Sequence, residues 1–84
     1  MMSESEEFSL AYNALKIEAD IYLEFKDFKN AILKYKKLKE FCDERKRYKE
    51  KIVCYAQLGH SHGLLDMHTT AVKYYHKMLE LAWE

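Results

Sequence analysis

Residues 55–81, YAQLGHSHGLLDMHTTAVKYYHKMLEL, repeat the size pattern of residues 15–41, LKIEADIYLEFKDFKNAILKYKKLKEF. When the two segments are aligned at a shift of 40 residues, the size class of the side chain is kept at nearly every one of six positions. The matched pairs are Ala19 with Gly59, Ala31 with Ala71, Leu15 with Tyr55, Tyr22 with His62, Tyr35 with Tyr75 and Leu38 with Met78. A period between about 20 and 50 residues is typical of arrays built from one repeated supersecondary unit.

Each copy has the pattern of helices and not of strands. Apolar residues recur at three- and four-residue spacing, and the strict alternation of a half-buried strand is missing. The chain has no proline and only two glycines, so little interrupts a helix. We therefore predict an all-α fold with four helices at about 6–25, 28–42, 47–64 and 68–83. The short links between them predict two antiparallel helical hairpins.

The small residues and the aspartates predict local features of these hairpins. Ala19 precedes Ala31 by the same interval that separates Gly59 from Ala71, and such a pair lets two antiparallel helices approach closely at one crossing. The large residues on either side then interlock. As N-caps we expect Asp27 for the second helix and Asp66 or Thr69 for the fourth.

Length and charge limit the classes of partner. The chain has 84 residues, which is one small domain. Its 14 basic and 14 acidic side chains cancel, so no long-range field favours nucleic acid or an anionic membrane as a partner. The basic run at 45–51 includes Glu50 and follows Asp43 and Glu44, so we interpret it as a solvated surface between helices, with an anion-binding patch as the alternative.

The cysteines and the N-terminal segment bear on the compartment. Cys42 and Cys54 form no C-x-x-C motif and fall within helical apolar patterns, which predicts buried reduced thiols and a reducing compartment. Residues 1–7 are acidic and lack an apolar run, so we interpret them as an N-terminal tail that is neither a signal peptide nor an anchor. No segment approaches the roughly 18 apolar residues of a membrane span.

The histidines of GHSHGLLDMH, residues 59–68, do not predict a metal site. On a helix, His60 and His62 lie about 200° apart around the axis, so the two side chains cannot bind one ion. His62 takes the position of Tyr22 in the first copy, and His68 takes that of Phe28. We therefore predict structural roles for His62 and His68, with adventitious metal binding as the alternative.

Catalytic and nucleic-acid motifs are missing from the sequence. It offers no Ser/His/Asp or Cys/His set and no glycine-rich phosphate loop, so we expect neither an enzyme nor a cofactor. A DNA-recognition helix should be basic, whereas residues 68–83 carry Lys73 and Lys77 against Glu80.

The segment Tyr55-Ala56-Gln57-Leu58-Gly59, followed by Ala71 and Tyr75, resembles a tetratricopeptide repeat, whose pattern sets an aromatic before Leu-Gly and then an alanine and a further aromatic. The first copy fits less fully, with Leu15 for the leading aromatic and Glu18-Ala19 for Leu-Gly. The resemblance implies an α-α superhelix over residues 8–84, with repeat one at about 12–51 and repeat two at about 52–84.

The match departs from the common pattern in two respects. The closing proline is absent, and the period of 40 exceeds the usual length of roughly 34 residues. In this the chain resembles the longer variant found in polarity and spindle-orientation scaffolds and in some ciliary proteins. That resemblance implies a cytoplasmic location, including cytoskeletal or ciliary sites.

The resemblance also implies a non-catalytic function in which the first helix of each hairpin lines a concave surface for a protein or peptide. It maps this groove to Asn13, Lys16, Asp20, Leu23, Glu24, Val53, Ala56, His60, Gly63 and Leu64. The second half is apolar, with a small-residue notch at Ala56 and Gly63 that suits an apolar anchor of a peptide. The alternative, in which this stripe covers further repeats, stays open. The lysine and asparagine clamp of chaperone-binding members is absent.

Stacked repeats generally need three or more units, because each hairpin covers the apolar face of its neighbour. We therefore expect the chain to be a fragment of a tetratricopeptide scaffold with neighbouring repeats. The alternative is a self-associating four-helix unit, a homo-oligomer formed through the face that carries Tyr74, Leu81 and Trp83.

Overall fold

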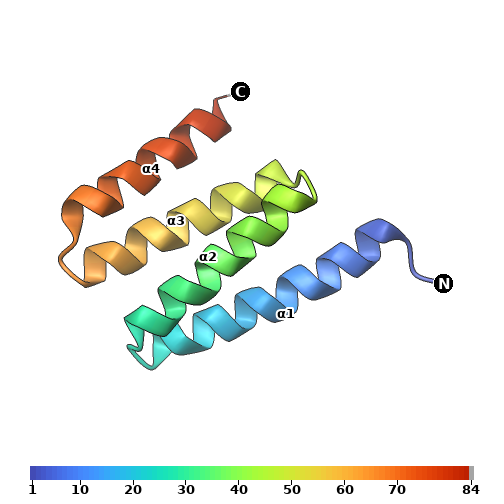
Figure 1. The fold of residues 1–84 in the computed structure, drawn as a ribbon, viewed down its shortest axis with the longest axis horizontal. Coiled ribbons are helices and arrows are strands. Elements are labelled where there is room, and N and C mark those ends of the chain that lie inside the picture. Colours follow the sequence, from blue (N-terminus) through green and yellow to red (C-terminus); the bar gives the residue numbers. More distant parts are fainter. Residues whose placement is uncertain (84) are drawn as a thin grey trace.

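The computed structural model describes residues 1–83 and contains four α-helices joined by three-residue turns (Figure 1). The helices are α1 (Glu4–Glu24), α2 (Phe28–Glu44), α3 (Tyr48–Leu64) and α4 (His68–Ala82). Consecutive helices run antiparallel, and residues 1–83 contain no strand. The predicted all-α fold, with four helices in two hairpins, is confirmed.

The first helix begins earlier than predicted, inside the segment that we interpreted as a tail. The Ser3 side chain caps it by accepting a hydrogen bond from the backbone N–H of Glu6 at 3.2 Å, and the Ser3 hydroxyl also donates to the Glu6 carboxylate. Glu4, Glu6 and Glu7 lie in the first turn, where negative charge complements the helix dipole. The acidic segment 1–7 is therefore mostly the first turn of α1.

All three turns have the same backbone geometry. In the first, the N–H of Asp27 donates to the carbonyl of Tyr22 at 2.9 Å and that of Lys26 donates to Leu23 at 3.0 Å. This pair of bonds is the Schellman motif, and it recurs at Arg47 and at Met67. The central residue of each turn has a left-handed backbone, with φ of 61° at Lys26, 55° at Lys46 and 59° at Asp66.

The residue after each left-handed position is the N-cap of the next helix. Asp27 caps α2 as predicted, because its side chain accepts from the Asn30 N–H at 3.4 Å. The prediction for the fourth helix is wrong: Asp66 holds the left-handed position, Thr69 lies inside the helix, and the N-cap is Met67, which makes no side-chain bond. Arg47 likewise caps α3 without a side-chain bond.

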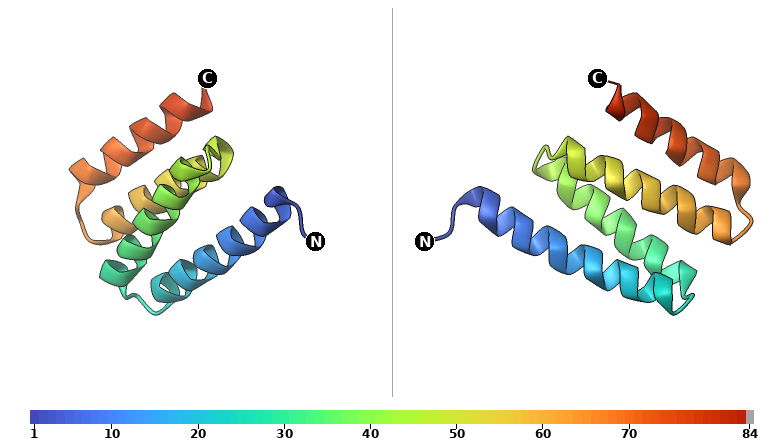
Figure 2. Two further views of the ribbon diagram at one scale, coloured as in Figure 1. Left: turned by 45° about the vertical axis from the view of Figure 1, so that its right-hand side comes forward. Right: turned by 180° about the vertical axis from the view of Figure 1, so that it is seen from behind.

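The four helices lie side by side in chain order, and each packs mainly on its neighbours in the sequence (Figures 1 and 2). The Cα trace measures 45 × 32 × 15 Å, so the molecule is a thin slab. α2 and α3 are covered on two sides, whereas α1 and α4 form its two ends. A slab of this thickness leaves much of each outer helix in contact with solvent.

The core divides into two clusters along α2. One contains Ala19, Ala31, Ile32, Tyr35 and Leu58, and the other contains Phe8, Leu38, Cys42 and Cys54. Ala19 and Ala31 are both fully buried in the same cluster, as expected for a close crossing. At Gly59 the nearest neighbour is not Ala71: a Cβ there would lie 2.9 Å from the Tyr75 ring.

The cysteines are free and fully buried. A hydrogen bond with Cys42, together with burial, raises the pKa of the Cys54 thiol. Since the thiolate is the reactive form, Cys54 acts as a small core residue.

Candidate functional site

A hollow of the surface lies between α1 and α3, the first helices of the two hairpins. Its volume is about 400 Å³, and it opens beside the turn that links α1 to α2. Eight residues line it: Asp20, Leu23, Glu24, Lys26, Phe28, Gln57, His60 and Leu64. We call this hollow the α1/α3 groove.

Five of the ten predicted groove residues line it, namely Asp20, Leu23, Glu24, His60 and Leu64. Lys16 lies beside it through its ion pair with Asp20. Asn13 and Val53 are exposed outside the lining, and Ala56 and Gly63 are half-buried outside it. The small-residue notch that we predicted is therefore not part of this cavity.

Three lining residues, Lys26, Phe28 and Gln57, were not predicted. Gln57 could have been found, because it lies three residues before His60 and seven before Leu64, on the same stripe of α3. Lys26 and Phe28 reach the groove because of the geometry of the turn between α1 and α2. The left-handed residue of this turn is a lysine and not a glycine, so nothing in the sequence indicated that geometry.

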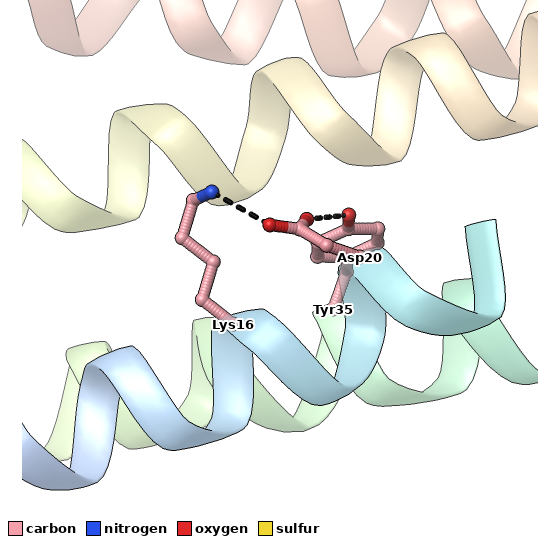
Figure 3. A network of polar contacts seen from close by, with 3 residues as sticks. All are labelled: Lys16, Asp20 and Tyr35. Atoms are coloured by element: carbon pink, nitrogen blue, oxygen red, sulfur yellow. Dashed lines mark hydrogen bonds and ion pairs between the residues drawn. The ribbon is translucent and has the colours of Figure 1, made fainter. Parts of the chain in front are cut away.

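A polar network fixes one wall of the groove (Figure 3). The Tyr35 hydroxyl of α2 donates a hydrogen bond to the Asp20 carboxylate, and Lys16 Nζ lies 2.9 Å from the other oxygen of that carboxylate. Burial, followed by this hydrogen bond, raises the pKa of Tyr35, so the hydroxyl stays protonated as a donor. Asp20 is thus held in one position by the core on one side and by Lys16 on the other.

The lining combines apolar and charged side chains. Leu23, Phe28 and Leu64 supply the apolar part, whereas Asp20, Glu24 and Lys26 supply charges of both signs. A lining of this type suits a ligand with an apolar body and a few polar groups.

The histidines lie apart. His62 is buried, with Nδ1 2.8 Å from the Leu58 carbonyl oxygen and its ring 5.1 Å from that of Tyr74, as a structural role requires. His60 is exposed at the groove. The structural role predicted for His68 is wrong, because its side chain is 74% exposed and lies 3.5 Å from Asp66. Residues 1–83 contain no group of three or more side chains that could hold a metal ion.

The basic run at 45–51 is partly built into the packing. The guanidinium of Arg47 lies 4.6 Å from the centre of the Phe8 ring, and that of Arg45 lies 5.1 Å from that of Phe41. Lys51 reaches Asp43 at 2.5 Å and so joins α3 to α2. The interpretation as a solvated surface therefore holds only for part of the run.

The predicted self-association residues do not share one exposed face. Tyr74 is half-buried with its ring 6.1 Å from that of Tyr55, so it packs against α3. Leu81 is half-buried, and of the three only Trp83 is exposed, at 86%. The exposed large apolar residues of α4 are instead Val72, Tyr75 and Leu79, with Trp83 at its C-terminal end.

The sequence matches no protein-family model, no curated protein and no solved structure. Within the described part of the chain, no helix is both long and apolar enough to cross a lipid bilayer.

Proposed function

We propose that this chain is a non-catalytic protein-interaction module that binds a peptide segment of a partner protein in the α1/α3 groove. The observation that carries the proposal is the position of the groove: the first helices of both hairpins line it, as the resemblance to tetratricopeptide repeats implies. Under this proposal the chain is part of a scaffold, and it needs no cofactor.

The lining favours a particular kind of peptide. A volume of about 400 Å³ holds one or two side chains, so an apolar anchor would pack against Leu23, Phe28 and Leu64. Glu24 and Asp20 lie on one side of it, so a basic residue next to the anchor would gain a charge-assisted hydrogen bond. Because Tyr35 and Lys16 already position Asp20, little ordering of the wall is needed on binding.

The two buried free thiols agree with a reducing compartment, and we include a cytoplasmic location in the proposal.

Peptide selection tests this function directly. Peptides selected from a random phage-displayed library on the immobilised chain should bind in solution, and Leu64→Asp should weaken that binding at least about tenfold, because it places a charge in the apolar part of the groove. Fluorescence anisotropy with labelled peptides gives the affinities.

Leu33→Asp is the matched control. Leu33 is exposed on α2 and does not line the groove, so the same change there should leave the affinity unaltered. Selected peptides that bind both variants equally, or a library that yields no binder, would contradict the proposal.

A further inference from the structure

The outer surface of α4 carries an apolar stripe that residues 1–83 leave partly exposed, although the ring of Tyr75 at its edge also packs beside Gly59 of α3. Val72 is 52% exposed, Tyr75 37%, Leu79 48% and Trp83 86%. Their spacing of three and four residues places them on one side of the helix. We call this stripe the α4 end face.

The opposite end of the slab carries a second stripe, on α1. Leu10 and Ile17 are each 58% exposed, Ile21 is 47% and Phe25 is 80%, and Ala14 between them is also exposed. We call this stripe the α1 end face. The two end faces lie on the outermost helices, at opposite ends of the row in Figure 1.

The internal repeat indicates what each end face fits. At a shift of 40 residues α4 corresponds to α2, which packs on α3. Val72 and Tyr75 then correspond to Ile32 and Tyr35, which are 8% and 0% exposed. Ile32 and Tyr35 share a core cluster with Leu58 of α3 as well as with Ala19 of α1, so the α4 end face repeats a surface that α2 buries in the stack.

The same shift relates α1 to α3. Ala14 and Ile21 correspond to Cys54 and Ser61, which are fully buried, and Phe25 corresponds to Leu65, which packs on the core cluster of α2. Ala14, Ile21 and Phe25 of the α1 end face thus correspond to buried or core-packed positions, whereas Leu10 and Ile17 correspond to the half-buried Glu50 and Gln57. One chain carries counterparts of both halves of the α2/α3 interface, at opposite ends.

Apolar residues of α1 and α4 correspond to residues that make polar contacts in the α2/α3 interface. Inside the stack, Asp43 pairs with Lys51 at 2.5 Å, and Lys39 Nζ lies 5.9 Å from the centre of the Tyr55 ring. The residues that correspond to the first pair are Trp83 and Ala11, and those that correspond to the second are Leu79 and Leu15. Trp83 and Leu79 belong to the α4 end face, whereas Ala11 and Leu15 are half-buried beside the α1 end face, and Leu15 also packs against the core cluster of Leu38 and Cys42. Glu18 and Glu24 are charged residues beside this stripe of α1, and Glu18 already has a partner in Lys34 at 2.7 Å.

We infer that the α4 end face binds the α1 end face of a second copy of this chain, in the register by which α2 packs on α3. The contact is head-to-tail, so an assembly of any length keeps one free α4 end face and one free α1 end face and grows by repetition. In this register, the contact between two copies repeats the α2/α3 interface that joins the two hairpins of one copy. The interface is distinct from the proposed peptide groove, and its test does not depend on that function.

Sedimentation velocity over a wide range of protein concentration tests the inference. The weight-average mass should rise beyond that of two chains without reaching a plateau. Leu79→Asp blocks one end and Ile21→Asp blocks the other, so each variant alone should stay monomeric. An equimolar mixture of the two should form a dimer and stop there, because only one pair of intact end faces remains.

Lys73→Asp and Ser9→Asp are matched controls that should assemble like the unaltered chain. Both residues are exposed, and both correspond to exposed positions of the inner helices, Leu33 and Lys49. Circular dichroism verifies that every variant stays helical. A monomeric unaltered chain, self-association of Ile21→Asp through paired α4 faces, or folded variants that fail to form the mixed dimer would overturn the inference.

Discussion

The helices α2 and α4 have the same place in their hairpins and nearly the same pattern of large and small residues, yet they differ in what covers them. Tyr35 of α2 is fully buried and hydrogen-bonds to Asp20, whereas Tyr75 of α4 is 37% exposed. Leu38 is 1% exposed, and its counterpart Met78 is half-buried. In a stack of helices, burial therefore depends on the neighbours of a helix as much as on its own sequence.

Truncation of these two tyrosines should give the largest difference in the free energy of unfolding between a change in α2 and the matching change in α4. Tyr35→Ala should lower the free energy of unfolding by about 3–5 kcal/mol, because it removes a large buried side chain and leaves a cavity between α1, α2 and α3. Tyr75→Ala should cost about 1–2 kcal/mol, since part of that ring is already in water. Urea unfolding followed by circular dichroism gives both values.

Tyr35→Phe serves as the control for packing. It keeps the ring and removes only the hydroxyl, which donates a hydrogen bond to the Asp20 carboxylate. It should cost about 1–2 kcal/mol, clearly less than the truncation. Equal losses for Tyr35→Ala and Tyr75→Ala would mean that the two helices are covered to the same extent, contrary to their exposures.

The sequence predicted those features of the fold that depend on the periodicity of apolar residues. Three- and four-residue spacing was enough for the number of helices, the hairpins and the burial of Ala19 and Ala31. It did not reveal how the helices end, because Lys26, Lys46 and Asp66 adopt a left-handed backbone that glycine usually supplies. The sequence does contain a signal for the early start of α1, the capping-box spacing of Ser3 and Glu6.

The groove was predicted only in part for a related reason. The resemblance to tetratricopeptide repeats assigned the groove to the first helix of each hairpin, and Asp20, Leu23 and His60 of that assignment line it. The contributions of Lys26 and Phe28 depend on how the first turn bends toward α3, which no stripe encodes. His68 was assigned by analogy with Phe28, but it begins an outer helix and lies in solvent. Analogy between repeats therefore does not predict which residues of the outermost helices are buried.

The two glycines of α3 sharpen the comparison further, because only one of them faces α4. A Cβ at Gly59 would lie 2.9–3.0 Å from the Tyr75 ring, whereas a Cβ at Gly63 would meet nothing within 4 Å. Gly63→Ala should raise the free energy of unfolding by about 1 kcal/mol through helix propensity alone. Gly59→Ala should be less stable than Gly63→Ala by about 1–2 kcal/mol, since the ring of Tyr75 must move.

A double-mutant cycle identifies the cause. In the Tyr75→Ala background, Gly59→Ala should recover the gain of about 1 kcal/mol that helix propensity provides. If Gly59→Ala stays unfavourable without the Tyr75 ring, the close approach of α3 and α4 at this point does not explain the glycine.

The smallest expected effect on stability concerns the turns that precede α2 and α4. The two turns have the same backbone geometry, but only one of them ends in a residue whose side chain caps the next helix. Asp27 caps α2 with its side chain, whereas Met67, at the same position before α4, is 46% exposed and makes no capping bond. Met67→Ser should supply an acceptor for an unpaired N–H of the first turn of α4 and should be more stable than Met67→Ala by about 1 kcal/mol.

The comparison with Met67→Ala is the informative one, because both changes remove the methionine side chain and only serine can cap. In a domain of this size a difference of about 1 kcal/mol corresponds to roughly 4–8 °C in Tm, which thermal unfolding resolves. Arg47, the third N-cap, is less suited to the test since its guanidinium packs on Phe8. Equal Tm values for the two Met67 variants would mean that the first turn of α4 frays in solution, and that its N–H groups are already satisfied by water.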